Sequence, residues 1–178
     1  IILSRGELKK LFSSIYNKKH ILIIQFIYSS GLRVSEIINL KIQDLELNKS
    51  YGFVRNGKGN KDRIFIVAET LKEDIKNLIE KEKLKTEDYL FNTNRKSKYN
   101  IRSIQQIIKN AVKIAGVNKK ISPHTLRHSF ATHLIENGYS VSEIQALLGH
   151  KSPETTMIYL HASLPNMIKV NSPLDNSQ

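Results

Sequence analysis

The chain has 178 residues, enough for one globular domain with a sizeable core. Lys and Arg outnumber Asp and Glu by 28 to 16, and this excess of 12 positive charges favours a nucleic acid or an anionic membrane surface as partner. The absence of cysteine excludes disulfides, thiolate zinc sites and cysteine nucleophiles. No apolar run is long enough to span a membrane, and no signal peptide precedes the first predicted helix. We therefore expect an intracellular, cytoplasmic protein.

The N-terminal segment carries helical signals. Ser4 and Glu7 are spaced as a capping box ahead of apolar residues that recur at helical spacing. A second apolar helix is expected from about His20 to Ser30, where Gly31 ends it. A shorter helix is expected from about Val34 to Leu40.

The next stretch changes to the period of β-strands. Short strands are expected at Asp44 to Leu47, Tyr51 to Arg55 and Arg63 to Val67. The last two are separated by the glycine-rich turn from Asn56 to Asn60, which carries Lys58. The pattern predicts a small three-stranded antiparallel sheet with a basic hairpin tip.

The remainder of the chain returns to helical patterns. A helix ended by Gly116 is expected from about Ile101 to Ala115. The other helix starts are marked by N-terminal signals: Thr70 with Glu73, Ser122 with Pro123, Ser140 with Glu143, and Ser152 with Pro153. The predicted fold is therefore mainly α with a small three-stranded antiparallel β-sheet (α+β).

A possible phosphate site begins at His124-Thr125-Leu126-Arg127-His128. His124 and Arg127 are three residues apart at a helix start, where backbone N–H groups and the helix dipole also favour an anion. Taken alone, such a pair is more often a surface or capping feature. Tyr159, further along the chain, could supply a phenol nucleophile.

Two other cations could join this site. Arg33 precedes a predicted helix, with Glu36 three residues on that could orient its guanidinium, although an ordinary surface pair has the same spacing. Lys58 lies between two glycines at the hairpin tip, where most lysines are simply solvated. Spacing leaves both assignments open.

Five motifs nevertheless occur in a specific order. They are Gly31-Leu32-Arg33-Val34-Ser35-Glu36, Gly57-Lys58-Gly59-Asn60-Lys61, the run His124 to His133, Leu147-Leu148-Gly149-His150, and Tyr159. In this order they resemble the catalytic domain of the tyrosine recombinase (phage integrase) family, over about Ser4 to Tyr159. The Xer-type branch is the most similar, and the ending from Lys169 to Asp175 resembles the tail of its archaeal members.

The resemblance implies a covalent reaction with DNA. Tyr159 matches the nucleophile that attacks the scissile phosphate, forms a 3′-phosphotyrosyl link and releases a 5′-hydroxyl. Lys58 matches the lysine proposed to protonate the leaving 5′-oxygen, with Lys61 and Arg63 as neighbours that could be mistaken for it.

The same resemblance implies roles for the remaining site residues. Arg33 and Arg127 match the arginines that clamp the non-bridging phosphate oxygens. His124 matches the histidine that assists proton transfer near the nucleophile, and His150 matches the histidine that hydrogen-bonds the phosphate. Glu36 corresponds to a frequent acidic residue that we interpret as support for Arg33.

No cofactor and no metal are expected. A phosphotyrosine conserves the energy of the cleaved bond, and the chain lacks a GxxxxGK[ST] phosphate loop. His124 and His128 have the spacing of helix-borne zinc ligands, but Thr-Leu-Arg separates them and the HExxH glutamate is missing. We expect His128 and His133 to pack or hydrogen-bond inside the domain.

The predicted organisation is a catalytic domain over residues 1–161 and a C-terminal tail over 162–178 that could contact a neighbouring protomer. The N-terminal core-binding domain of the family is expected to be absent from this chain. The resemblance implies a site-specific recombinase that acts on double-stranded DNA as a homotetramer on synapsed sites. Chromosome dimer resolution and mobile-element or phage integration both remain open. A non-catalytic helix-turn-helix regulator, formed by Ser140 to Tyr159, is the alternative outside enzymes.

Overall fold

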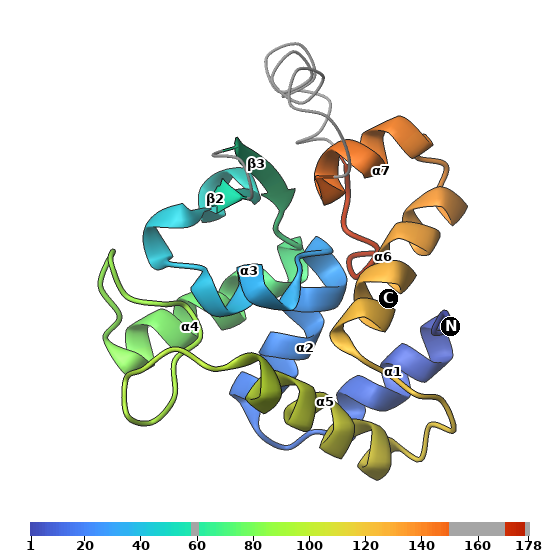
Figure 1. The fold of residues 1–178 in the computed structure, drawn as a ribbon, viewed down its shortest axis with the longest axis horizontal. Coiled ribbons are helices and arrows are strands. Elements are labelled where there is room, and N and C mark those ends of the chain that lie inside the picture. Colours follow the sequence, from blue (N-terminus) through green and yellow to red (C-terminus); the bar gives the residue numbers. More distant parts are fainter. Residues whose placement is uncertain (58–60, 150–169, 177–178) are drawn as a thin grey trace.

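The computed structural model describes residues 1–57, 61–149 and 170–176. Its helices and strands follow the predicted order (Figure 1). They are α1 (Arg5–Ser13), α2 (Lys18–Ser30), α3 (Val34–Asn39), β1 (Leu45–Glu46), β2 (Tyr51–Gly57), β3 (Lys61–Ile66), α4 (Lys72–Glu82), α5 (Ile101–Ala115), α6 (Pro123–Glu136) and α7 (Val141–Leu148). The predicted fold class is confirmed. Within the described ranges, none of these helices has the length and apolar character needed to cross a bilayer.

Helix α2 is the centre of the core. From Leu22 to Ser30 it buries nearly every side chain, and it packs against α1, α4, α6 and β3. The ring of Phe26 meets the edges or faces of Phe65 and Phe91, with ring centroids 6.0 and 5.7 Å apart. Because α2 touches both the other helices and the sheet, it fixes where its own C-terminal end, Gly31, lies relative to both.

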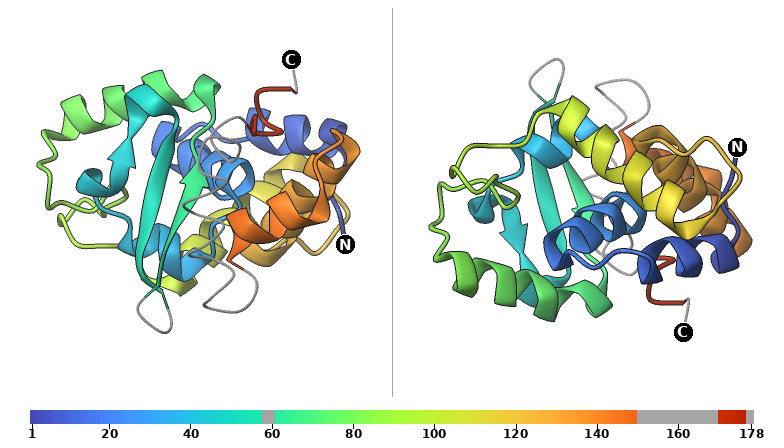
Figure 2. Two further views of the ribbon diagram at one scale, coloured as in Figure 1. Left: turned by 90° about the horizontal axis from the view of Figure 1, so that it is seen from above. Right: turned by 90° about the horizontal axis from the view of Figure 1, so that it is seen from below.

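The sheet is antiparallel in the order β1-β2-β3. Residues Phe53 and Ile64 face each other in the long hairpin of β2 and β3. The sheet and α4 occupy one half of the molecule, whereas α1, α6 and α7 occupy the other (Figure 2). Strand β3 lies nearer the second half and contacts α7. Through this contact the hairpin of β2 and β3 is held beside α7.

Most of the predicted helix starts are confirmed by their hydrogen bonds. Capping boxes form at Ser4 with Glu7 and at Ser140 with Glu143, and Ser122 accepts the backbone N–H of Thr125. The prediction of a capping box at Thr70 and Glu73 is wrong, because the helix begins after a 3₁₀ turn over Glu69–Leu71. The helix expected after Ser152-Pro153 lies outside the described residues.

The C-terminal segment 170–176 supplies the missing cap. Asp175 accepts hydrogen bonds from the backbone N–H groups of Glu69 and Thr70, both at 3.0 Å, and from the Thr70 hydroxyl at 2.9 Å. Ser172 donates to the carbonyl of Ser29 at 2.8 Å, and Leu174 is buried. This segment (red in Figure 1) therefore packs on its own domain. Contact of the tail with another protomer stays a prediction.

Candidate active site

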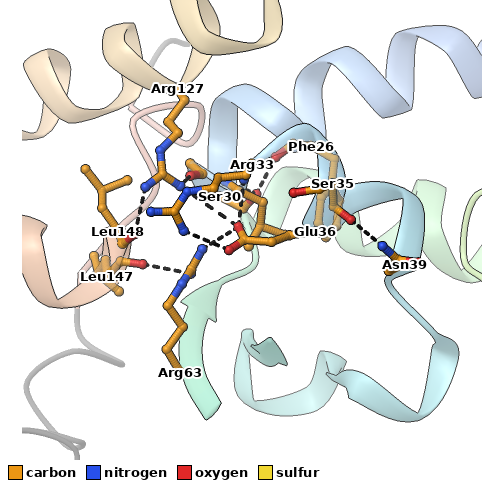
Figure 3. Close-up of polar contacts among 12 residues, drawn as sticks. Phe26, Ser30, Arg33, Ser35, Glu36, Asn39, Arg63, Arg127, Leu147 and Leu148 are labelled. Carbon is orange, nitrogen blue, oxygen red and sulfur yellow. Dashed lines mark hydrogen bonds and ion pairs between the residues drawn. The ribbon is translucent and has the colours of Figure 1, made fainter. Parts of the chain in front are cut away.

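Three guanidinium groups converge on one carboxylate, that of Glu36 (Figure 3). Arg33 Nη1 lies 3.0 Å from Glu36 Oε1, Arg63 Nη2 is paired with Glu36 Oε2, and Arg127 Nη1 lies 4.0 Å from the same Oε2. The three arginines come from the start of α3, from β3 and from α6. We call these four residues the arginine cluster. Three guanidinium groups and one carboxylate leave it with two net positive charges.

Arg33 is the most open member of the cluster. Its side chain is 44% exposed, and its backbone N–H donates to Glu36 Oε2 at 2.7 Å. Glu36 therefore fixes both the main chain and the guanidinium of Arg33, as its position three residues later predicts. The exposed side of this guanidinium can reach a ligand outside the domain.

Arg127 is buried between two helix ends. Its Nη1 donates to the carbonyl of Gly31, the C-cap of α2, and its Nη2 donates to the carbonyl of Leu148, the last residue of α7, at 2.7 Å. The C-terminal ends of helices carry partial negative charge, so both ends stabilise the cation. Burial, followed by repulsion from Arg33 and Arg63, lowers the pKa of Arg127 to about 10. At neutral pH it remains charged.

The glycine that ends α2 allows this close packing. Gly31 has φ +64°, and a Cβ placed there would lie 2.5 Å from the ring of Phe130 and 2.9 Å from Leu148. Any other residue would push α2 away from α6 and α7. Gly31 thus holds its carbonyl within reach of Arg127.

Arg63 is the member that the sequence alone did not reveal. The sequence indicates Arg63 only as a basic neighbour of Lys58. In the structure its side chain is only 7% exposed, and its Nη1 donates to the carbonyl of Leu147 at 3.0 Å. Burial lowers its pKa, while Glu36 opposes the shift. One signal could have found it: Arg63 opens an apolar run, Ile64 to Ala68, whose residues are all buried.

The histidines of α6 differ in their surroundings. His124 and His128 are exposed, and their rings stack with centroids 6.3 Å apart. The prediction that His128 packs inside the domain is therefore wrong, because one helical turn after His124 it lies on the same outer face. His133 is buried, as predicted, and its Nδ1 is 2.8 Å from the Tyr28 hydroxyl.

Three predicted site residues, Lys58, His150 and Tyr159, lie outside the described residues. Their roles stay predictions. The structure does describe the chain next to two of them: Gly57 pairs with Lys61 at the end of the hairpin, and Gly149 follows α7. Of the predicted site residues that it describes, it brings Arg33 and Arg127 together, whereas His124 is not part of their hydrogen-bond network.

The cluster has the chemistry of an oxyanion site. Arginine presents planar pairs of donors that suit phosphate oxygens, and two net positive charges match the charge that a phosphodiester gathers during cleavage. Through residues 1–57, 61–149 and 170–176, no group of three or more His, Asp or Glu side chains is placed to hold a metal ion.

Fold and cluster together define a basic, mostly helical domain with three arginines gathered at one carboxylate. The model of the phage integrase family matches residues 3–164, nearly the whole chain. The chain therefore belongs to the phage integrase family.

Curated relatives give the same assignment. The chain is 42% identical over 160 residues to tyrosine recombinase XerA of Pyrococcus horikoshii, which covers 88% of this chain and 55% of the relative. It is 38% identical over 157 residues to a tyrosine recombinase of Pseudothermotoga lettingae, covering 88% and 54%. The chain thus spans about half the length of these relatives.

Solved structures share the fold. A crystal structure of XerA recombinase superposes with a TM-score of 0.79 at 38% identity, covering 94% of this chain and 62% of that one. The XerH site-specific recombinase bound to its difH substrate, in a pre-cleavage complex, gives a TM-score of 0.73 at 28% identity, covering 95% and 52%. The arrangement of helices and sheet is therefore that of Xer-type recombinases.

Proposed function

We propose that this chain is the catalytic part of a site-specific DNA recombinase that cleaves and rejoins strands through a 3′-phosphotyrosyl intermediate. The observation that carries the proposal is the convergence of Arg33 and Arg127, from separate elements, on one carboxylate. Membership of the phage integrase family and the similarity to Xer-type relatives support it. Because the chain spans only about half the length of these relatives, the activity of the whole protein is part of the proposal.

In the proposed cleavage step the Tyr159 hydroxyl gives its proton to His124, the proposed acceptor, and the Tyr159 oxygen attacks the phosphorus. The bond from phosphorus to the 5′-oxygen breaks, and that oxygen takes a proton, for which Lys58 is the proposed donor. Rejoining reverses the step, with a 5′-hydroxyl displacing the tyrosine. The phosphate stays in diester form throughout, so the reaction needs no external energy source.

Arg33 and Arg127 have a distinct task in this scheme. The transition state places extra negative charge on the non-bridging oxygens, and preorganised cations stabilise it more than the ground state. Loss of one such donor typically costs about 10²- to 10³-fold in rate. We assign His124 to proton transfer near Tyr159 and His150 to a hydrogen bond with the phosphate.

Tyr159→Phe tests the chemistry. Duplexes that bind the chain are first selected from a random library, and a nick is then placed beside the cleavage site so that the intermediate cannot be reversed. We expect a protein–DNA adduct on a denaturing gel with the natural chain and none with Tyr159→Phe. Tyr16→Phe is the matched control, since Tyr16 is 94% exposed and lies outside the cluster. Binding to DNA without any adduct would instead favour the regulator.

The proposed partner is a double-stranded target site, bound by a homotetramer on two synapsed copies, in the cytoplasm. Structural neighbours include the XerH recombinase solved with difH substrates before and after cleavage, which supports the DNA partner. We propose chromosome dimer resolution as the role, because the curated relatives above 35% identity include XerA, XerC and XerD recombinases. Recovery of bound fragments from the source genome tests this: the ends of a mobile element, in place of one chromosomal locus, would contradict it.

A further inference from the structure

The buried guanidinium of Arg63 joins three parts of the site. Arg63 belongs to β3, the strand that leads out of the hairpin loop, and it bonds Glu36 of α3 and the Leu147 carbonyl of α7. Its side chain is 7% exposed and both of its Nη atoms are occupied by protein acceptors. Figure 3 shows this guanidinium directed at Glu36 and at the carbonyl of Leu147.

We propose that Arg63 is a positioning residue, which occupies Glu36 so that Glu36 does not draw Arg127 away from the scissile phosphate. This inference deepens the proposed function and rests on it. In the protein, Arg63 and Arg127 compete for the same oxygen, Glu36 Oε2, and Arg63 is the one in direct contact. Arg127 stays 4.0 Å away because its donors are taken by carbonyls of α2 and α7.

The expected failure without Arg63 follows from these distances. A partly buried carboxylate that loses its closest cation recruits the next one, since an uncompensated charge is costly. Arg127 is that cation, and a direct Arg127–Glu36 pair would consume the charge needed by the phosphate. The loss would therefore be electrostatic, not merely structural.

Arg63 also fixes the end of α7. Consecutive carbonyls at this end are divided between the two arginines: Leu147 accepts from Arg63 and Leu148 from Arg127. Gly149 continues the contact, since a Cβ there would lie 2.6 Å from Arg63 Cδ and 2.7 Å from its Nε. Arg63 thus fixes the C-terminal end of α7, which precedes His150 in the sequence.

The test compares Arg63→Met, Arg63→Lys and the double variant Arg63→Met/Glu36→Gln in the 178-residue chain. Cleavage of the nicked duplex is measured with a normal scissile phosphate and with a methylphosphonate, in which a methyl group replaces one non-bridging oxygen and removes the charge. We expect Arg63→Met to cleave the phosphate about 10²-fold more slowly, close to the loss of a whole donor. Most of that loss should vanish with the methylphosphonate.

The double variant and the lysine variant separate positioning from packing. Removing the negative charge of Glu36 together with Arg63 removes the group that would draw Arg127 away from the phosphate, so the double variant should cleave faster than Arg63→Met alone. Arg63→Lys keeps a cation beside Glu36 and should retain most activity. Equal losses on both substrates, or a double variant slower than Arg63→Met, would overturn the inference.

A second measurement keeps the inference separate from the proposed function. The rise in melting temperature on adding inorganic phosphate should be smaller in Arg63→Met than in the natural chain and should return in the double variant. Arg55→Met is the matched control. Like Arg63, Arg55 lies in a strand and is paired with a carboxylate, that of Asp44, but its side chain is 51% exposed and it lies outside the cluster. An undiminished phosphate response in Arg63→Met refutes the inference even if Tyr159 cleaves DNA. A chain that never forms the adduct but shows this pattern refutes only the cleavage proposal.

Discussion

Glu36→Gln removes the one negative charge of the arginine cluster. The substitution keeps an amide oxygen that can accept hydrogen bonds, so the change is chiefly electrostatic. The Glu36 side chain is 14% exposed, and it neutralises Arg63 and orients Arg33. Without it, the two buried cations Arg63 and Arg127 and the more exposed Arg33 repel one another with no negative charge between them. We expect a large loss of stability and a new dependence on anions.

The magnitude follows from the burial of the partners. Removing one member of a buried ion pair costs about 3 to 5 kcal/mol, and the retained hydrogen-bond acceptor puts Glu36→Gln near the lower end, about 3 kcal/mol. For a domain of this size each kcal/mol lowers the melting temperature by about 2 to 4 °C, so a fall of about 6 to 12 °C is expected. Phosphate that binds in the cluster at a hundred times its dissociation constant would return about 2.7 kcal/mol.

The assay is thermal unfolding in chloride and in phosphate at equal ionic strength. Phosphate also stabilises proteins in general, so the control must lose a comparable ion pair elsewhere. Glu82→Gln serves this purpose, because Glu82 is paired with Lys19 and their side chains are 24% and 14% exposed. The reasoning is refuted if phosphate stabilises Glu36→Gln no more than it stabilises Glu82→Gln.

Two further predictions concern the parts that hold the domain together. Asp175→Ala removes the cap of the 3₁₀ turn before α4 and should cost about 1 kcal/mol, or about 2 to 4 °C in melting temperature, with Glu87→Ala as an exposed control. A loss equal to that of the control would argue against the cap. Burial lowers the pKa of His133 below its usual 6.5, so the unfolded chain takes up a proton first as pH falls. Its contribution to stability is therefore full above pH 6.5 and declines below it, and chemical unfolding of His133→Gln should show a shallower decline between pH 6.5 and 5.

Local sequence signals predicted the fold well because they act within a few residues. The capping box of Ser4 with Glu7 and the glycine after α2 need no information from the rest of the chain, and both are confirmed. The box at Thr70 failed because its backbone N–H is capped by Asp175, 105 residues away. A signal over four residues cannot anticipate such a distant competitor.

A contact in the site could be predicted where two residues are close enough in the sequence for their spacing to determine it. The spacing of Arg33 and Glu36 predicts their contact, which the structure confirms. The position of Arg63 before a buried apolar run could suggest that it is buried, but its partners are set only once β3, α3 and α7 meet. His128 was misplaced for a related reason: helical spacing puts it on the face of His124, but whether that face is covered depends on the other helices.

The arginine cluster is a costly way to build a core. Apolar side chains in place of the buried pair Arg63–Glu36 would be at least as stabilising, because buried ion pairs seldom repay their desolvation. What they could not do is bond the guanidinium of Arg33, as Glu36 does, or the carbonyl of Leu147, as Arg63 does, beside the buried cation of Arg127. The partial charges of two helix ends stabilise that cation without neutralising it, as a second carboxylate would. If the proposed function holds, a bound phosphate supplies the negative charge that the cluster lacks, and its binding stabilises the domain at the site of the reaction.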